Sequence, residues 1–151
     1  MSELKTKLQS DLNGAIKSRN TVVAETIRMV LTAITNEEVA GKEKKELSDA
    51  EIITVLTREA KKRREAAEAF EAGGRADRAA AERAEGEVIA SYLPAQLSEA
   101  EIRNLIAETI AAVGATGPSD MGKVMGSLKA KVAGKADGAL VSSLVKEALN
   151  K

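Results

Sequence analysis

The chain of 151 residues contains no cysteine and no histidine, and these two absences exclude much of ordinary enzyme chemistry. Without cysteine there is no disulfide, no thiolate nucleophile and no cysteine-ligated zinc. Without histidine the chain lacks the commonest general base and metal ligand, so a histidine-containing catalytic triad is excluded. A phosphate-cradling Walker sequence is also absent. We therefore expect no independent catalytic activity, no catalytic residue, no metal site and no cofactor.

Aromatic residues are nearly absent, with one Phe, one Tyr and no Trp, so recognition of single-stranded bases by stacking is not expected. The 23 Lys and Arg residues balance 23 Asp and Glu residues, which leaves no global attraction to nucleic acid or membrane. No apolar run is long enough to span a membrane, and the charged N-terminal segment lacks the apolar core of a signal peptide. These features predict a soluble cytoplasmic protein that does not bind a membrane.

Apolar residues recur with helical periodicity along the chain, and no alternating pattern typical of strands is evident. The predicted fold class is therefore all-α. Helices are expected over residues 2–17, 21–39, 48–72, 75–91, 98–113, 119–132 and 137–150. Ser48 and Ser98 each begin a predicted capping box. Ile16 in the first helix and Leu140 in the last are expected on the apolar stripes of those helices.

The segment Tyr92-Leu93-Pro94 interrupts the helical pattern, because proline lacks an amide donor and disfavours helix in the residue before it. Long, charge-rich helices precede this point, and shorter helices separated by glycines follow it. We expect an N-terminal bundle of long helices over residues 1–93 and a smaller three-helix subdomain over residues 94–151.

The segment from Asp120 to Gly138 is the most informative part of the sequence. Gly122 and Gly126 lie four residues apart in a predicted helix, where each glycine costs roughly 1 kcal/mol relative to alanine. On a helical wheel they share an outward face with Ala130, opposite the apolar stripe. Such a smooth face indicates close approach of another backbone, and either a phosphate backbone or a second helix fits it.

Lysines are concentrated in the same segment, with four lysines and no acid between residues 121 and 136. Binding of nucleic acid through them would depend on salt and would use backbone and shape contacts. The candidate nucleic-acid-binding residues are Gly122, Lys123, Gly126, Ser127, Lys129, Lys131, Gly134, Lys135 and Gly138.

A second basic run, Arg58–Arg64, lies in the third predicted helix. It is either a phosphate-binding patch or a solvated face, and the glutamates interleaved with it favour the solvated face because oppositely charged residues one turn apart stabilise a helix. The sequence leaves this choice open.

Several segments in order give the chain a resemblance to the GatB/YqeY family over nearly its whole length. These segments are Ile27–Val30, Asn36–Glu37, Arg58–Arg63, Glu68–Phe70, Tyr92–Ser98, Asp120–Gly126 and Gly134–Gly138. The resemblance implies an all-helical fold in two parts. It also implies similarity to the tail of the B subunit of glutamine-dependent tRNA amidotransferase, which helps to hold the body of tRNA.

The leading functional hypothesis is accordingly a non-catalytic helical module that binds tRNA at its body or elbow. The first alternative is a protein–protein adaptor associated with an amidotransferase or a translation factor. A further alternative follows from the family's label, which implies an accessory to carbon–nitrogen ligase activity with glutamine as amido-N-donor.

Overall fold

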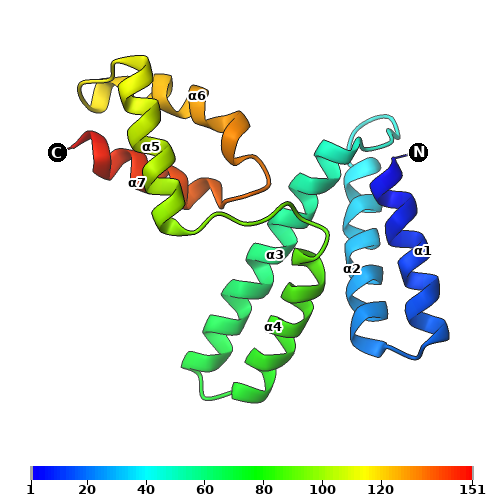
Figure 1. The fold of residues 1–151 in the computed structure, drawn as a ribbon. Helices are drawn as coiled ribbons and strands as arrows, with labels where there is room; N and C mark the ends of the chain where they lie inside the picture. Colours follow the sequence, from blue (N-terminus) through cyan, green and yellow to red (C-terminus); the bar gives the residue numbers. More distant parts are fainter. Residues whose placement is uncertain (1, 151) are drawn as a thin grey trace. The chain divides into compact units, whose positions relative to one another are not determined.

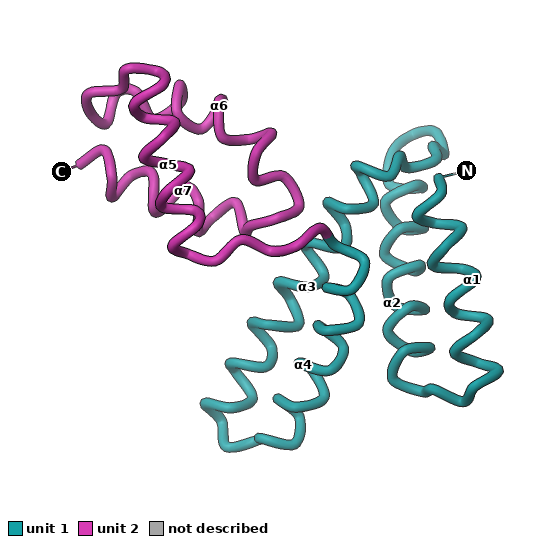
Figure 2. Tube along the Cα trace, in the orientation of Figure 1, with its two compact units in different colours: residues 1–93 teal, residues 94–151 magenta. Residues whose placement is uncertain are grey.

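The computed structural model describes residues 2–150, and over this range it contains seven α-helices, one short 3₁₀ helix and no strand (Figure 1). The predicted all-α fold class is confirmed. The observed helices differ from the predicted ranges by one or two residues at their ends. The chain forms two compact units, Met1–Leu93 (unit 1) and Pro94–Lys151 (unit 2), which are coloured separately in Figure 2.

Unit 1 contains four helices. They are α1 (Glu3–Lys17), α2 (Thr21–Glu38), α3 (Asp49–Ala72) and α4 (Ala76–Ala90). The side chains of Ser2, Asn20 and Ser48 each accept a hydrogen bond from a free amide at the start of a helix. At Ser48 the Glu51 side chain also reaches back to the backbone, so the predicted capping box is confirmed.

The core of unit 1 is aliphatic and draws on all four helices and on the loop between α2 and α3. Its buried members are Leu8, Ile27, Val30, Ile34, Leu47, Ile52, Val55, Leu56 and Ile89. Ile16 lies outside this core and is 47% exposed, so the prediction that it lies on the buried stripe of α1 is wrong. It belongs to the last turn of α1, where the chain turns back before α2 can cover it.

Glu38 ties three segments of unit 1 together from a site that is only 3% exposed. Its carboxylate accepts a hydrogen bond from Lys5 Nζ on α1 at 2.8 Å and from the backbone N–H of Leu47 at 3.3 Å. The bond from Lys5 is the main reason that the pKa of Glu38 is lowered. The charged carboxylate therefore joins α1, the end of α2 and the following loop.

Tyr92 closes unit 1 by bonding to α1. Its hydroxyl donates to the Asp11 carboxylate at 2.5 Å, and Lys7 Nζ lies 4.7 Å from the centre of its ring. Burial, together with the Asp11 carboxylate, raises the pKa of the Tyr92 hydroxyl. The residue therefore stays protonated and able to donate.

Unit 2 contains three α-helices and the 3₁₀ helix. They are α5 (Glu99–Val113), η1 (Pro118–Asp120), α6 (Met121–Val132) and α7 (Gly138–Leu149). Ser98 and Glu101 form the predicted capping box at the start of α5. The buried core is formed by Ile102, Ile106, Val124, Leu128, Val132, Val141, Leu144, Val145 and Leu149. Leu140 is 39% exposed, which contradicts the prediction that it lies on the apolar stripe of α7.

Candidate nucleic-acid interface

One face of α6 carries the predicted binding residues. The other face buries Val124, Leu128 and Val132 in the core of unit 2, with Met121 and Met125 packed beside them. This leaves the second face to solvent, and its exposed residues are Gly122, Lys123, Gly126, Ser127, Lys129, Ala130 and Lys131, which we call the α6 strip.

The glycines of the α6 strip do not accommodate another part of unit 2. A Cβ atom added at Gly122 or Gly126 would meet no heavy atom within 4 Å, outside its chain neighbours and its own helix backbone. Packing against a second helix of the same unit therefore does not explain them. Their helix backbone is instead open to solvent.

The four lysines of this region are exposed and free of salt bridges to any residue that the structure describes. Lys123 feels a Coulombic attraction from Asp120, one turn before it. That carboxylate is already held by the backbone N–H of Thr116 at 2.9 Å, the main cause of its lowered pKa. Lys129, Lys131 and Lys135 face solvent without a carboxylate partner among residues 2–150.

The loop after α6 depends on a glycine. Ala133 has φ −55° and ψ 121°, Gly134 has φ 72°, and the Lys135 N–H donates to the Val132 carbonyl at 2.9 Å. These are the features of a type II turn, whose third residue needs a positive φ and is therefore usually glycine. The turn fixes the position at which Lys135 leaves the helix.

Residues just before α5 hold this loop in place. The Leu97 N–H donates to the Lys135 carbonyl at 2.9 Å, and the Gln96 side-chain amide donates to the Gly134 carbonyl at 2.8 Å. Asp137 then caps α7 by accepting from the Ala139 N–H at 3.3 Å. Gly138, the first residue of α7, is exposed and has open space at its Cβ position. The structure thus brings Gly134, Lys135 and Gly138 into one loop region that follows the α6 strip.

The model of the Yqey-like protein family matches residues 5–149. The chain belongs to this family. No curated protein matches it.

In this Yqey-like chain the second basic run, Arg58–Arg64, is largely neutralised by carboxylates. Arg58 pairs with Glu37 on α2 at 3.1 Å, and Lys62 pairs with Glu59 at 3.1 Å. Arg63 lies 3.1 Å from Glu82 and 3.5 Å from Glu85, both on α4. Lys61 and Arg64 also take part in interactions. The run therefore contributes ion pairs within unit 1, in contrast to the lysines of unit 2.

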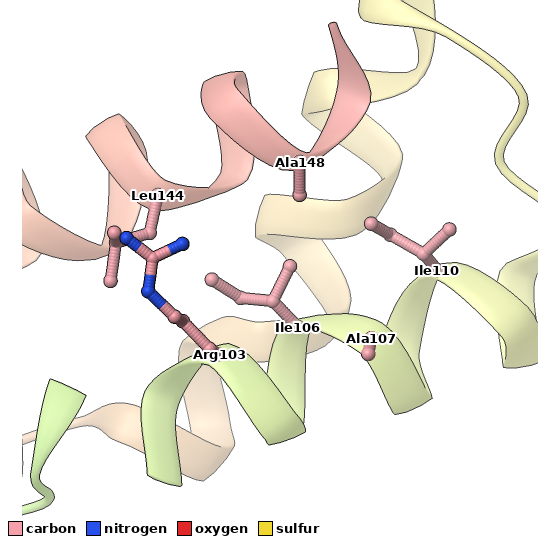
Figure 3. A pocket seen from close by; sticks show the side chains of 6 residues that line it. All are labelled: Arg103, Ile106, Ala107, Ile110, Leu144 and Ala148. Carbon is pink, nitrogen blue, oxygen red and sulfur yellow. The ribbon is translucent and has the colours of Figure 1, made fainter. Parts of the chain in front are cut away.

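A cavity between α5 and α7 measures about 370 Å³, and all of its lining residues except Arg103 are aliphatic. Figure 3 shows Ile106, Ala107 and Ile110 on α5 facing Leu144 and Ala148 on α7, with Arg103 at one end. Arg103 pairs with Glu147 and with Glu99, each at 3.3 Å. The lining offers no pair of acid and base groups. The cavity is therefore an apolar surface without a candidate catalytic group among its lining residues.

Two further properties concern residues 2–150 as a whole. No helix in this range has the length and apolar character needed to cross a bilayer. The same range contains no cluster of three or more carboxylates placed to hold a metal ion.

Sequence reasoning missed two parts of this region. The bonds from Gln96 and Leu97 to the α6–α7 loop join residues 38 positions apart, and no local pattern signals them. The role of Thr116 in holding Asp120 was also missed. An Asp preceded by Thr and Pro near a helix start could have suggested it, because such short polar side chains commonly bond to nearby backbone amides.

Proposed function

We propose that unit 2 is a non-catalytic module that holds the folded body of tRNA through the α6 strip and the α6–α7 loop. The observation that carries this proposal is an exposed helix face that combines bare backbone at Gly122 and Gly126 with lysines that form no salt bridge with a described residue. Bare backbone permits close approach, and lysines attract phosphate. The resemblance to the tRNA-holding tail of the amidotransferase B subunit supports the same ligand.

The mode of contact follows from the side chains that are present. The α6 strip has no aromatic residue on which a base could stack, and no arginine for paired hydrogen bonds to a base edge. Lysine contributes a point charge that suits phosphates without reading sequence. The module is therefore proposed to read the shape and backbone of a folded RNA, with affinity that falls as salt rises.

The first test is a titration of folded tRNA with the full chain at several salt concentrations. We expect micromolar or tighter binding at low salt, and Lys123→Ala and Lys131→Ala should each reduce the slope of log K against log salt by about one. Lys146→Ala is the matched control, because Lys146 is an exposed lysine of α7 outside the α6 strip. An equal effect of all three substitutions would contradict the proposed surface.

Specificity needs a separate comparison. Equal affinity for tRNA and for unrelated RNA and DNA duplexes would remove tRNA from the proposal, although not the basic surface. The competing function is a protein–protein adaptor, in which a partner helix packs on Gly122 and Gly126. Complex formation that resists nuclease and is lost in Gly126→Leu would favour that adaptor.

A further inference from the structure

The turn between α1 and α2 is built on a backbone geometry that usually requires glycine. The Asn20 N–H donates to the Ala15 carbonyl at 2.9 Å and the Arg19 N–H donates to the Ile16 carbonyl at 3.2 Å. This pair of bonds defines a Schellman motif, in which the residue after the cap takes a left-handed conformation. Here that residue is Arg19, with φ 59°.

The end of another helix in unit 1 has the same motif, with glycine at the left-handed position. At the end of α3 the Arg75 N–H bonds to the Phe70 carbonyl and the Gly74 N–H bonds to the Glu71 carbonyl, with Gly74 at that position. Among residues 2–150, Arg19 is the one non-glycine residue with a positive φ. An arginine in a conformation that L-residues rarely adopt indicates a use for its side chain.

The surroundings of Arg19 combine positive charge with exposed aliphatic surface. Ile16 and Val22 are 47% and 46% exposed, and they flank the turn. Lys17 and Arg28 are also exposed, and neither they nor Arg19 form an ion pair with any described residue. Glu25 is the single acid among the residues that line the adjacent cavity, which include Arg19 and Arg28, so cations are in excess there.

A cavity lies at this surface, beside the turn between α1 and α2. It measures about 260 Å³ and is lined by Ala15, Ile16, Arg19, Asn20, Thr21, Ala24, Glu25 and Arg28. This is below the range of roughly 300–1,000 Å³ that small-molecule sites usually have. The dimensions suit one side chain of a protein partner better than a cofactor.

We propose that this α1–α2 tip docks an acidic amphipathic segment of a partner protein. Ile16, Arg19 and Arg28 line its cavity, and the exposed Lys17 and Val22 lie on the two sides of the turn. Lys17, Arg19 and Arg28 give the tip an excess of positive charge, which favours a partner with carboxylates because complementary potentials promote association. The exposed Ile16 and Val22 select an aliphatic face on the partner. A phosphate backbone would use the cations and leave both aliphatic side chains without a partner.

The test uses the full chain and a fluorescein-labelled 14-residue helical peptide with leucines on one face and glutamates on the other. A second peptide with lysine in place of each glutamate is the probe control. We expect saturable binding of the acidic peptide alone, with amide chemical-shift changes centred on residues 15–28. Absence of saturable binding, or equal binding of both peptides, would overturn the proposal.

Variants at Arg19 separate its charge from its effect on folding. Arg19→Gly and Arg19→Asn remove the charge with residues that tolerate the left-handed conformation, whereas Arg19→Lys keeps a cation. We expect the first two to weaken peptide binding by about three- to fivefold and Arg19→Lys to change it by less than about twofold. Equal binding of all three variants would overturn the proposal.

Two further measurements exclude other roles for Arg19. Arg19→Gly should raise the Tm of unit 1 by about 2–4 °C because it relieves the backbone. Fluorescence of Tyr92, the single tyrosine, reports this transition. A lower Tm would mean that Arg19 stabilises the fold and would overturn the proposal.

The second measurement is tRNA binding by Arg19→Gly. Weaker binding would mean that the α1–α2 tip contacts nucleic acid and would also overturn the proposal, whereas loss of tRNA binding confined to α6 variants leaves it intact.

Discussion

Gly126 and Gly134 lie on the two sides of Val132, and only Gly134 has a backbone conformation that favours glycine. Gly126 lies within α6 and has open space at its Cβ position, so nothing in unit 2 requires it to be glycine. Gly134 has φ 72° in the turn after the helix, where a side chain is strained. The same substitution should therefore have opposite effects on stability at these two positions.

We expect Gly126→Ala to stabilise unit 2 by about 0.5–1 kcal/mol, because alanine is the better helix former. Gly134→Ala should destabilise it by roughly 1 kcal/mol or more, because alanine opposes the positive φ. Amide hydrogen exchange of Val124 and Leu128 measures both changes. Ala130→Gly is the control for helix propensity and should reverse the sign of Gly126→Ala. Destabilisation by Gly126→Ala would contradict the open geometry of α6.

The same Gly126→Ala variant also tests the proposed ligand contact. If a phosphate backbone approaches the α6 strip closely, the added methyl group should weaken tRNA binding although the folded chain is more stable. A titration with folded tRNA measures this. Unchanged affinity would mean that the ligand does not contact the backbone at Gly126 and that the lysines act at longer range.

Among the elements, the connection of α1 to α2 through Glu38 depends on pH. The pKa of Glu38 is lowered in the folded chain, mainly by the hydrogen bond from Lys5. The charged carboxylate therefore contributes stability that is fully present above about pH 4.3, where an unfolded glutamate titrates. This contribution is lost as pH falls through the lower pKa of the folded state.

We expect Glu38→Gln to lower the free energy of unfolding by about 2 kcal/mol at pH 7, because it weakens a buried, charge-assisted pair. The difference from wild type should shrink towards pH 3. Urea unfolding followed by Tyr92 fluorescence measures both values. Glu37→Gln is the neighbouring control, since Glu37 is 46% exposed in its pair with Arg58 and should change stability by less than about 1 kcal/mol.

The helices also show which structural features can be predicted from the sequence. Ser48 and Ser98 were sufficient to predict the starts of α3 and α5, because capping depends on residues within one turn of each other. Ile16 and Leu140 were wrongly assigned to buried stripes. Periodicity identifies the face of a helix that can be buried, but not how far the neighbouring helix extends over it. The outward face of α6 was predicted from the same periodicity, whereas its ligand stays a prediction.

On the scale of the whole molecule, each compact unit has its own aliphatic core. We propose that residues 1–93 and residues 94–151 are separate folding domains. A domain of about 60 residues is usually only marginally stable, and residues 94–151 are close to this length. Its capped α5 and the hydrogen-bonded α6–α7 loop favour independent folding.

Expression of residues 94–151 alone should therefore give a dispersed amide NMR spectrum and tRNA affinity within about threefold of the full chain. Residues 1–93 alone should fold and bind tRNA much more weakly. NMR spectra and tRNA titrations of the two fragments measure these outcomes. A collapsed spectrum for residues 94–151 would show that unit 2 requires unit 1 to fold, and equal tRNA affinity of both fragments would contradict the assignment of the ligand to unit 2.

The residues that connect the units are anchored at both ends. Tyr92 bonds to Asp11 in unit 1, and Leu97 bonds to Lys135 in unit 2. The five steps between them span at most about 18 Å at 3.6 Å per residue. Ligands bound to the two units would therefore share a short tether, which gives each an effective concentration in the millimolar range near the other. If an RNA on the α6 strip and a protein on the α1–α2 tip also bind each other, this effective concentration strengthens their complex, although the two ligands contact different residues of the chain.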